Sequence, residues 1–257
     1  MHQSLSGDKI LSIDIGGSHI KATILNAAGE LQIGFEIVDT PVLPGPPELL
    51  SAIREIVGKF PEYDKVSVGF PGYVKEGIVY TAPSIAPKKW SGINLRQILQ
   101  DEFNCPVEVV NDADMQGLGI VKGRGLEMVI TLGTGLGSAL FLNGVLLPHI
   151  ELSQHPFTTN LIYDRYMGKK ALEKEGDVKW NRRIQKVLLV LKTVFNYDHL
   201  YIGGGNSRKI NFPLDSNITL VSNEDGIKGG AKLWYAKPVV ELQLEAEKTG
   251  RQAATNF

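Results

Sequence analysis

Two stretches of this chain follow the same plan, and that repeat limits what the chain can fold into. The first, ILSIDIGGSHIKATILNAAGELQIG from Ile10, is an apolar run, a glycine turn, a second apolar run, an Asn/Gly turn and a third run. The second, MVITLGTGLGSALFLNGVLL, repeats this order about 118 residues later. In both copies the glycine turn joins two strands of one hairpin, unlike a Rossmann motif, whose glycines open a helix. The repeat predicts two similar α/β halves with a cleft between them.

Hydrophobic periodicity predicts the other elements. Strands are expected over 10–15, 22–25 and 31–38, and apolar residues at helical spacing predict a helix over 48–59. The strand KVSVGF, a strand over 107–110 and a helix that begins at Asn111 and Asp112 follow. In the second half we expect an apolar helix over 184–194, the strand HLYIGGG and a last helix over 226–237. The polar tail after Glu241 is expected to fray.

Composition narrows the class of protein. With 257 residues, 43% of them hydrophobic and 21% charged, the chain is typical of a soluble globular protein. A net charge of −1 gives no overall field for nucleic acid or membrane, and no run reaches the roughly 18 apolar residues of a membrane span. The single cysteine, Cys105, excludes an internal disulfide and a cysteine-bound zinc. We therefore expect a cytoplasmic protein without a secretion signal, membrane contact or nucleic-acid partner.

Positive charge gathers between residues 165 and 192. This segment holds nine Lys or Arg against three Asp or Glu, and Asp164 immediately precedes it. A solvated helix face is the more ordinary explanation, and a surface for a polyanion is the alternative.

The first glycine turn has the residue types of a phosphate site. Gly16 and Gly17 allow backbone amides to approach an anion, Ser18 adds a hydroxyl donor and Lys21 adds a positive charge. Asp14, in the preceding strand, would then serve Mg²⁺ through water. One such turn could be an ordinary hairpin, but two in matching places favour phosphate binding. The second turn offers Gly133, Thr134, Gly135 and Gly137.

Five motifs together resemble the ROK family of sugar kinases (repressor, open reading frame, kinase), part of the actin-like ATPase superfamily. They are DIGGSHIK from Asp14, GFPG from Gly69, the pair at 111–112, LGTGLG from Leu132 and GGG from Gly203. The resemblance spans roughly residues 9–235 and looks greatest to the polyphosphate glucokinases. It implies two ribonuclease-H-like domains, over 8–111 and 112–240, with a cleft between them and a polar tail over 241–257. The last helix could pack back on the first domain.

The resemblance also implies a reaction. A hexokinase-type enzyme of this family would move a phosphoryl group from ATP or inorganic polyphosphate to the 6-hydroxyl of glucose or a related hexose, with Mg²⁺ and as a homodimer. Asp112 would be the general base, although an aspartate before a helix can also be a cap. Asn111 would bind the sugar and Gly72 would shape its pocket. Gly204 and Gly205 would pass close to the nucleoside, or else form a strand-to-helix turn.

The sugar motif departs from the family pattern. The family's Glu-x-Gly-His is replaced here by Glu151, Leu152, Ser153 and Gln154, and a histidine, His155, lies one position later. Ser84 occupies the place of an asparagine that touches the sugar in the family. The resemblance therefore gives the following candidate sugar contacts: Ser84, Glu151, Gln154 and His155.

These departures leave two readings open. Gln and Ser can still bond to hydroxyls, but an altered contact in a hydrogen-bonding site weakens binding of the usual substrate. The chain could prefer another sugar, or it could be a catalytically weak or inactive sugar- and nucleotide-binding homologue. His155 could also be a surface histidine. A ROK-type repressor is disfavoured, because only about eight residues precede the first strand and a helix-turn-helix does not fit there.

Overall fold

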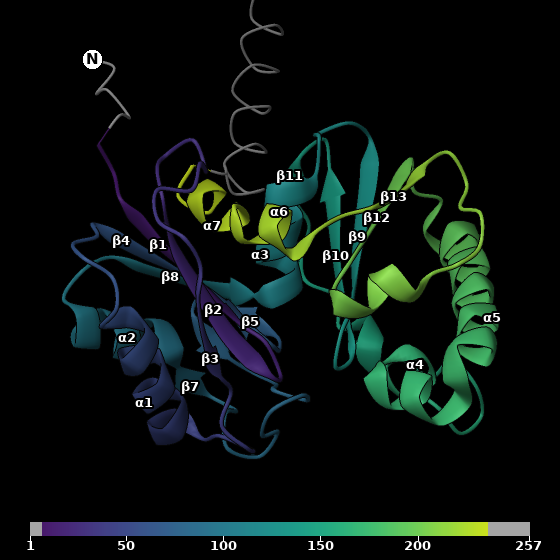
Figure 1. The fold of residues 1–257 in the computed structure, drawn as a ribbon, viewed down its shortest axis with the longest axis horizontal. Helices are drawn as coiled ribbons and strands as arrows, with labels where there is room; N and C mark the ends of the chain where they lie inside the picture. Colours follow the sequence, from purple (N-terminus) through teal and green to yellow (C-terminus); the bar gives the residue numbers. More distant parts are fainter. Residues whose placement is uncertain (1–6, 236–257) are drawn as a thin grey trace, which may run out of the picture.

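Two five-stranded sheets dominate the computed structural model, which describes residues 7–235 (Figure 1). The first sheet has the order β3-β2-β1-β4-β8, with β1 (Ile10–Ile15), β2 (His19–Leu25), β3 (Glu36–Asp39), β4 (Lys65–Phe70) and β8 (Val107–Asn111). The second has the order β11-β10-β9-β12-β13, with β9 (Leu126–Leu132), β10 (Leu136–Leu142), β11 (Val145–Leu146), β12 (His199–Gly203) and β13 (Ile218–Leu220). A small sheet joins β5 (Val74–Lys75), β6 (Ile78–Val79) and β7 (Ile93–Asn94).

The two large sheets share one topology. In each, three consecutive strands form an antiparallel meander. Two later strands then extend the sheet in parallel, next to the first strand of the meander. The predicted repeat and the α/β class are therefore confirmed.

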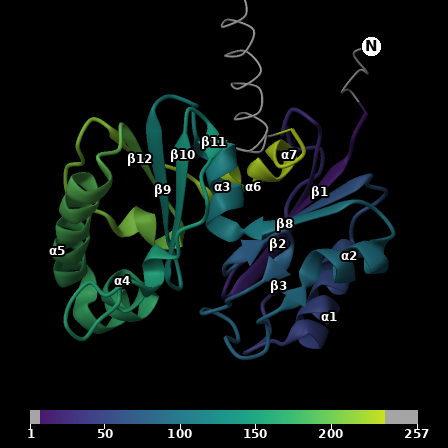
Figure 2. The same ribbon diagram turned by 180° about the vertical axis from the view of Figure 1, so that it is seen from behind.

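Helices lie outside and between the sheets. On the first sheet, α1 (Pro46–Val57) packs against β2 and β3, and α2 (Leu95–Phe103) packs against β8. On the second sheet, α5 (Lys169–Phe195) packs on the outer face and α4 (Tyr163–Met167) precedes it. Between the sheets lie α3 (Asp112–Ile120), α6 (Asn223–Ile227) and α7 (Gly229–Lys232), in both views (Figures 1 and 2). The 3₁₀ turns are η1 (Leu152–Gln154) and η2 (Gly205–Lys209). Over residues 7–235, the helices are too short or too polar to cross a membrane.

Alternation along β1 explains its lone aspartate. Leu11, Ile13 and Ile15 are fully buried in the core under α1 and α2. Successive side chains of a strand point to opposite faces, so Ser12 and Asp14 share the other face, where the central helices lie. There the Ser12 hydroxyl donates to the Ile227 carbonyl at 2.9 Å. The polar side chains of this apolar strand therefore face the helices that lie between the two sheets.

The helices that follow the second sheet pack on the first. The Ser67 hydroxyl in β4 donates to the Gly230 carbonyl at 2.6 Å, and Trp234 Nε1 donates to the Ser67 hydroxyl at 2.8 Å. Small residues permit this approach, because a Cβ on Gly230 would clash with Ser12 and one on Gly229 with the backbone of Met115. These contacts fix the end of the described chain to the sheet that began it.

Several predicted elements are wrong in extent. The helix expected over 184–194 is the second part of α5, which begins at Lys169 and is kinked at Gly176, and the strand expected over 22–25 begins at His19. The strand expected over 31–38 forms only over Glu36–Asp39; Leu31 makes an isolated bridge to Leu25. The Thr23 hydroxyl donates to the Ile33 carbonyl at 2.6 Å, a side-chain bond where a continuous strand would use the backbone. The last helix is divided at Lys228 into α6 and α7, and its expected residues 236–237 and the tail over 241–257 lie outside the described residues.

Candidate active site

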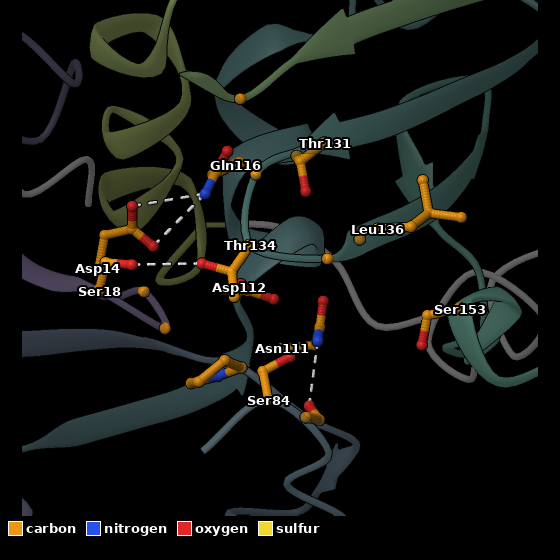
Figure 3. A pocket seen from close by; sticks show the side chains of 18 of the residues that line it. Asp14, Ser18, Ser84, Asn111, Asp112, Gln116, Thr131, Thr134, Leu136 and Ser153 are labelled. Atoms are coloured by element: carbon orange, nitrogen blue, oxygen red, sulfur yellow. Dashed lines mark hydrogen bonds between the residues drawn. The ribbon is translucent and has the colours of Figure 1, made fainter. Parts of the chain in front are cut away.

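A cleft of about 470 Å³ is bounded by residues of both large sheets. Every residue that the sequence predicts for the site lines this cleft except Gln154 and His155. In Figure 3 the labelled side chains run from Asp14 and Gln116 at one end to Ser153 at the other, with Asp112 and Asn111 between them. Ser18 of the first glycine turn and Ser153 of the altered sugar motif thus lie on opposite sides of this view, and Thr134 of the second turn lies between them.

The two glycine turns meet at their tips. Ser18 Oγ of the first lies 3.3 Å from Thr134 Oγ1 of the second (Figure 3). A Cβ on Gly17 would lie 3.2 Å from the same Thr134 oxygen, which is tighter than ordinary packing. The turns therefore form one continuous wall, rich in backbone amides and hydroxyls, and such a wall suits an anion.

Asp14 is held between neighbouring strands. Its register partners are Lys21 on β2 and Gly69 on β4, and Gln116 Nε2 lies 3.4 Å from both of its carboxylate oxygens. Burial raises the pKa of Asp14 to about 6, against the opposing effects of Lys21 and Gln116. Sequence reasoning missed Gln116, although it follows Asp112 by four residues on α3, a spacing that places two side chains on one helix face.

Internal symmetry gives Asp14 a counterpart. Thr131 of β9 pairs with Gly203 of β12, just as Asp14 of β1 pairs with Gly69 of β4. Both Asp14 and Thr131 line the cleft. The same fold position therefore carries a carboxylate in the first half and a hydroxyl in the second.

Asp112 is the first residue of α3, but Asn111 serves as the helix cap. Asn111 Oδ1 accepts from the backbone amides of Ala113 at 2.8 Å and Asp114 at 3.1 Å. Asp112 Oδ1 also accepts from the Ala113 amide, at 2.9 Å. Burial, followed by the negative charge of Asp14, raises the pKa of Asp112 to about 8. The helix end would be capped without this carboxylate, and the carboxylate has a high proton affinity.

Gly69 allows the two carboxylates to share one space. A Cβ at this position would lie 3.2 Å from Asp112 Cα and 3.6 Å from Asp14 Oδ1. A residue larger than glycine would therefore move the start of α3 away from β4. The GFPG motif thereby sets the distance between strand and helix at the centre of the cleft.

Asn111 and Gly72 are tied to each other. Asn111 Nδ2 donates to the Gly72 carbonyl at 3.0 Å, and a Cβ on Gly72 would clash with the backbone of Thr81. An amide carries two N–H donors, so one remains on Asn111 for a ligand. Ser84 lines the cleft beside them.

Three elements hold the second glycine turn. Asp164 Oδ1 on α4 accepts from the Leu136 amide at 3.1 Å, and Asn206 Nδ2 on η2 donates to the Gly133 carbonyl at 2.9 Å. The Lys169 amide at the start of α5 donates to the same carbonyl at 3.1 Å. Gly204 lies before η2 with φ +84, and Gly205 begins that turn. Lys169 and Asn206 line the cleft and were missed from sequence.

The expectation that Gln154 and His155 line the site is not met. Both are exposed, because the η1 turn buries Leu152 and Ser153 and directs the next two side chains outward. Gln154 Nε2 donates to the Ser153 hydroxyl at 2.9 Å, and that hydroxyl donates to Glu151 Oε1 at 2.7 Å. The His155 ring lies 6.0 Å from the ring of Tyr163.

A different histidine lines the cleft. His149 lies two residues before Glu151 and contacts Asp114, which is 35 residues away in the chain. Its nearness to Glu151 in sequence was the only available signal, since the pairing with α3 is a product of the fold. His19 of β2 also lines the cleft without having been predicted.

Comparisons with known proteins agree with the motifs. A model of the ROK family matches residues 10–148, more than half of the chain. Polyphosphate glucokinase of Mycobacterium leprae (strain TN) is 34% identical over 241 residues, covering 85% of this chain and 72% of the relative. Polyphosphate glucokinase of Mycobacterium tuberculosis (strain ATCC 25618 / H37Rv) is 32% identical over 237 residues, covering 85% of this chain and 88% of the relative.

Solved structures share the fold. The inorganic polyphosphate/ATP-glucomannokinase from Arthrobacter sp. strain KM has a TM-score of 0.80 and 29% identity, covering 93% of this chain and 100% of that one. A ROK family glucokinase from Streptomyces griseus in complex with glucose and AMPPNP has a TM-score of 0.73 and 19% identity, covering 88% and 98%. The actin-like ATPase fold expected from the motifs is thereby confirmed. This chain belongs to the ROK family.

Proposed function

We propose that the protein is a sugar kinase that transfers a phosphoryl group from ATP or inorganic polyphosphate to the 6-hydroxyl of glucose or a related hexose. One observation carries the proposal: a half-buried carboxylate, Asp112, lies in the same cleft as two glycine turns that meet at Ser18 and Thr134. The names of the relatives, polyphosphate glucokinase and polyphosphate/ATP-glucomannokinase, support the same reaction.

The glycine turns would bind the donor. Phosphoryl transfer depends mostly on positioning and on stabilising negative charge. Backbone amides, Ser18, Thr134 and the Lys21 ammonium supply both without forming a covalent intermediate. Gly16 and Gly17 of the first turn and Gly133, Gly135 and Gly137 of the second would let the chain approach phosphate oxygens, and Gly204 and Gly205 would border the nucleoside of ATP.

The residues present fit Mg²⁺. Within residues 7–235 no group of three or more His, Cys, Asp or Glu side chains could hold a metal ion. These residues therefore do not form a metal site made of protein ligands alone. Mg²⁺ instead keeps several waters and takes one or two carboxylates together with substrate phosphates. Asp14, half-buried and close enough to Asp112 for the two charges to interact, would be such a ligand, directly or through water. Bound there, the ion would offset the charge of the transferring phosphates.

Asp112 would act as the general base. In its ionised form a positioned carboxylate can take the proton of the attacking hydroxyl, and the pKa raised by burial and by Asp14 makes that form a stronger base. Asn111, Ser84, Gly72 and Glu151 would orient the hexose beside it. Gln154 and His155 have no direct part in this arrangement.

Polyphosphate is the donor that the charge distribution favours. Lys169 lies in the cleft wall next to the second glycine turn, and its nearest acidic partner, Glu173, is 3.9 Å away with both side chains exposed. The charges of Arg165 and Lys170 oppose the effect of burial on the pKa of Asp164, so both lie near that turn. A chain of phosphates leaving the cleft past Lys169 would meet these two cations.

The proposal also covers the cellular compartment and the oligomeric state. A free, half-buried Cys105 suits a reducing compartment, so we assign the enzyme to the cytoplasm. The family resemblance further suggests a homodimer that uses small-molecule substrates only.

The proposal is tested by assaying hexose-dependent release of ADP and shortening of polyphosphate side by side. Asp112→Asn should lower kcat by about 10²–10⁴-fold, because it removes the base while the Asn111 cap keeps the helix start. Asp101→Asn, on the surface helix α2, is the matched control and should keep full turnover. Wild-type turnover by Asp112→Asn would contradict the base assignment.

A catalytically weak or inactive homologue is the second candidate. The observation in its favour is the altered motif, in which the Gln154 side-chain amide donates to the Ser153 hydroxyl and that hydroxyl donates to Glu151. Calorimetric binding of glucose without turnover on any hexose, with either donor, would support this candidate over a sugar kinase.

A further inference from the structure

Three ionisable side chains form a row in the cleft wall around Glu151. His149 Nδ1 lies 3.1 and 3.0 Å from the two carboxylate oxygens of Asp114, and His149 Nε2 lies 3.7 Å from Glu151 Oε2. The side chains of His149 and Asp114 are only 5% and 6% exposed. The imidazole also stacks on Tyr73, with a centroid distance of 5.7 Å and an interplanar angle of 13°. Asp114 and Tyr73 together fix the plane of the ring.

The row ends in a pair of buried polar atoms. Among the described residues, neither His149 Nε2 nor Glu151 Oε2 has a hydrogen-bond partner. At 3.7 Å they are beyond ordinary hydrogen-bond distance, but opposite charges at this separation still attract, and more strongly where water is excluded. The other oxygen, Oε1, accepts from the Ser153 hydroxyl. Glu151 is therefore held by an imidazole on one oxygen and by a hydroxyl on the other.

This arrangement leaves one side of the carboxylate for a ligand. The Glu151 side chain is 25% exposed and lines the cleft, whereas Oε2 is buried. A carboxylate oxygen has two lone pairs, so Oε1 can accept a second hydrogen bond besides that of Ser153. The oxygen available to a substrate hydroxyl is the one that faces away from His149.

The electrostatics agree with the geometry. Burial opposes the charge of His149, but the hydrogen bond to Asp114 and the nearby Glu151 outweigh it and raise the pKa of His149 to about 10. Burial likewise opposes the charge of Glu151, and the contacts with His149 and Ser153 hold the pKa of Glu151 below its usual value. Burial raises the pKa of Asp114, and the facing His149 opposes that rise, so a protonated His149 would favour the ionised form of both neighbouring carboxyl groups.

We propose that Asp114 and His149 are positioning residues, which fix the Glu151 carboxylate so that its exposed side accepts a hydrogen bond from a hydroxyl of the hexose. The inference rests on the proposed sugar kinase function. It also accounts for the altered motif. His149 precedes Glu151 in the chain and lies beside its carboxylate, whereas Gln154 follows Glu151 and its side chain reaches only Ser153. His149 thus lies next to the carboxylate that the Gln154 side chain does not reach.

A double-mutant cycle tests whether His149 acts through Glu151. His149→Gln and Glu151→Gln should each raise the KM for glucose about tenfold or more, with the KM for the donor unchanged within about twofold. In the Glu151→Gln background, His149→Gln should add less than about twofold, because the group it positions is gone. His199→Gln is the matched control: this histidine bonds to Thr219 at 2.9 Å outside the cleft, and its replacement should change neither KM.

Equal increases in the KM for glucose in the two backgrounds would overturn the inference, since His149 would then act independently of Glu151. A lower melting temperature with both KM values unchanged would also overturn it, because the row would then be purely structural.

A second measurement does not depend on turnover. In ¹H–¹⁵N spectra of the histidine side chains, wild-type His149 should remain an imidazolium above about pH 8, and Asp114→Asn should shift its titration toward the ordinary range near pH 6.5. The KM for glucose of Asp114→Asn should then rise with pH over that range. A neutral His149 ring at pH 7 in the wild-type protein would overturn the inference. If no hexose supports turnover, the proposed function fails, and the same cycle is run on the calorimetric affinity for glucose.

Discussion

At the scale of single residues, the cleft depends on positions where a side chain is missing. Gly69 allows the start of α3 to lie against β4, and Gly72 lies against the backbone of Thr81. Gly204 has a positive φ, a conformation that side-chain-bearing residues rarely adopt. The glycine motifs that identify the family are thus steric requirements of the cleft as well as candidate phosphate contacts.

Adjacent glycines in the GGG motif that begins at Gly203 are predicted to differ in their tolerance of a side chain. Gly204→Ala should lower the free energy of unfolding by about 1–3 kcal/mol, because φ is +84 and the new Cβ would clash with the backbone of Leu132. Gly205→Ala is the matched control: the rest of the described chain leaves at least 4 Å around its Cβ, so the change should stay within about 0.5 kcal/mol. Urea unfolding measures both, and equal losses would contradict the steric reading.

At the scale of elements, alternation and glycine turns made much of the fold predictable. The strand over 10–15 and the hairpin of β9 and β10 follow from alternating or continuous apolar residues bounded by glycines. The strand over 31–38 was overestimated, because apolar spacing does not reveal that the Thr23 hydroxyl takes the Ile33 carbonyl. The break of the last helix at Lys228 depends on how closely α7 packs on β1, which is a tertiary property.

Site residues that belong to local sequence motifs could be predicted. Contacts between residues far apart in the sequence could not. Asp14, Asp112 and the glycine turns belong to local patterns, and all line the cleft. The contact between His149 and Asp114 joins a loop to α3 across 35 residues, so no local spacing encodes it. His155 was considered instead because it is next to Gln154 in sequence, but the η1 turn sends it outward.

The loop before β9 gives a prediction about pH and stability. Glu127 is 1% exposed and accepts from the backbone amides of Lys122, Gly123 and Arg124 and from the Tyr201 hydroxyl. Burial would raise the pKa of Glu127, but these donors outweigh it and lower the pKa below 4.5. A lowered folded-state pKa means that the stability contributed is complete above the unfolded value and is lost as pH falls through the folded value.

Glu127→Gln should therefore lower the free energy of unfolding by about 1–3 kcal/mol at pH 7 and reduce the loss of stability in acid. Urea unfolding at pH 7, 5 and 4 measures this. Glu108→Gln, a half-exposed residue of β8 that lies 3.7 Å from Arg96, is the matched control and should have little effect at any of these pH values. A loss for Glu127→Gln that is the same at each pH would contradict the charge-based account.

At the scale of the whole molecule, one topology is used twice and the copies are joined at the centre. Ser18 and Thr134 bring the two glycine turns together, and α6 and α7 return from the second sheet to Ser12 and Ser67 of the first. The cleft therefore lies where the two halves are held together. In this arrangement a phosphate donor would contact both halves, and the sugar would lie beside α3.

Charge along α4 and α5 gives a prediction about the donor. Activity with polyphosphate should fall more steeply between about 50 and 200 mM salt than activity with ATP, because a longer polyanion releases more counterions when it binds. Replacing Arg165 and Lys170 by alanine should reduce the salt slope with polyphosphate by roughly one per lost contact. Lys192→Ala is the control, since Lys192 pairs with Asp215 at the far end of α5. Equal salt slopes for both donors would contradict a contact between polyphosphate and this surface.

The most direct test of the central claim is a crystal structure of Asp112→Asn with Mg²⁺, glucose and a non-hydrolysable ATP analogue. The substitution slows transfer, so both substrates can be trapped in the cleft. We expect phosphate oxygens within hydrogen-bond distance of both glycine turns, and a glucose hydroxyl beside residue 112 and in line with the terminal phosphate. A donor bound away from one of the two turns, or a sugar bound out of reach of residue 112, would contradict the account.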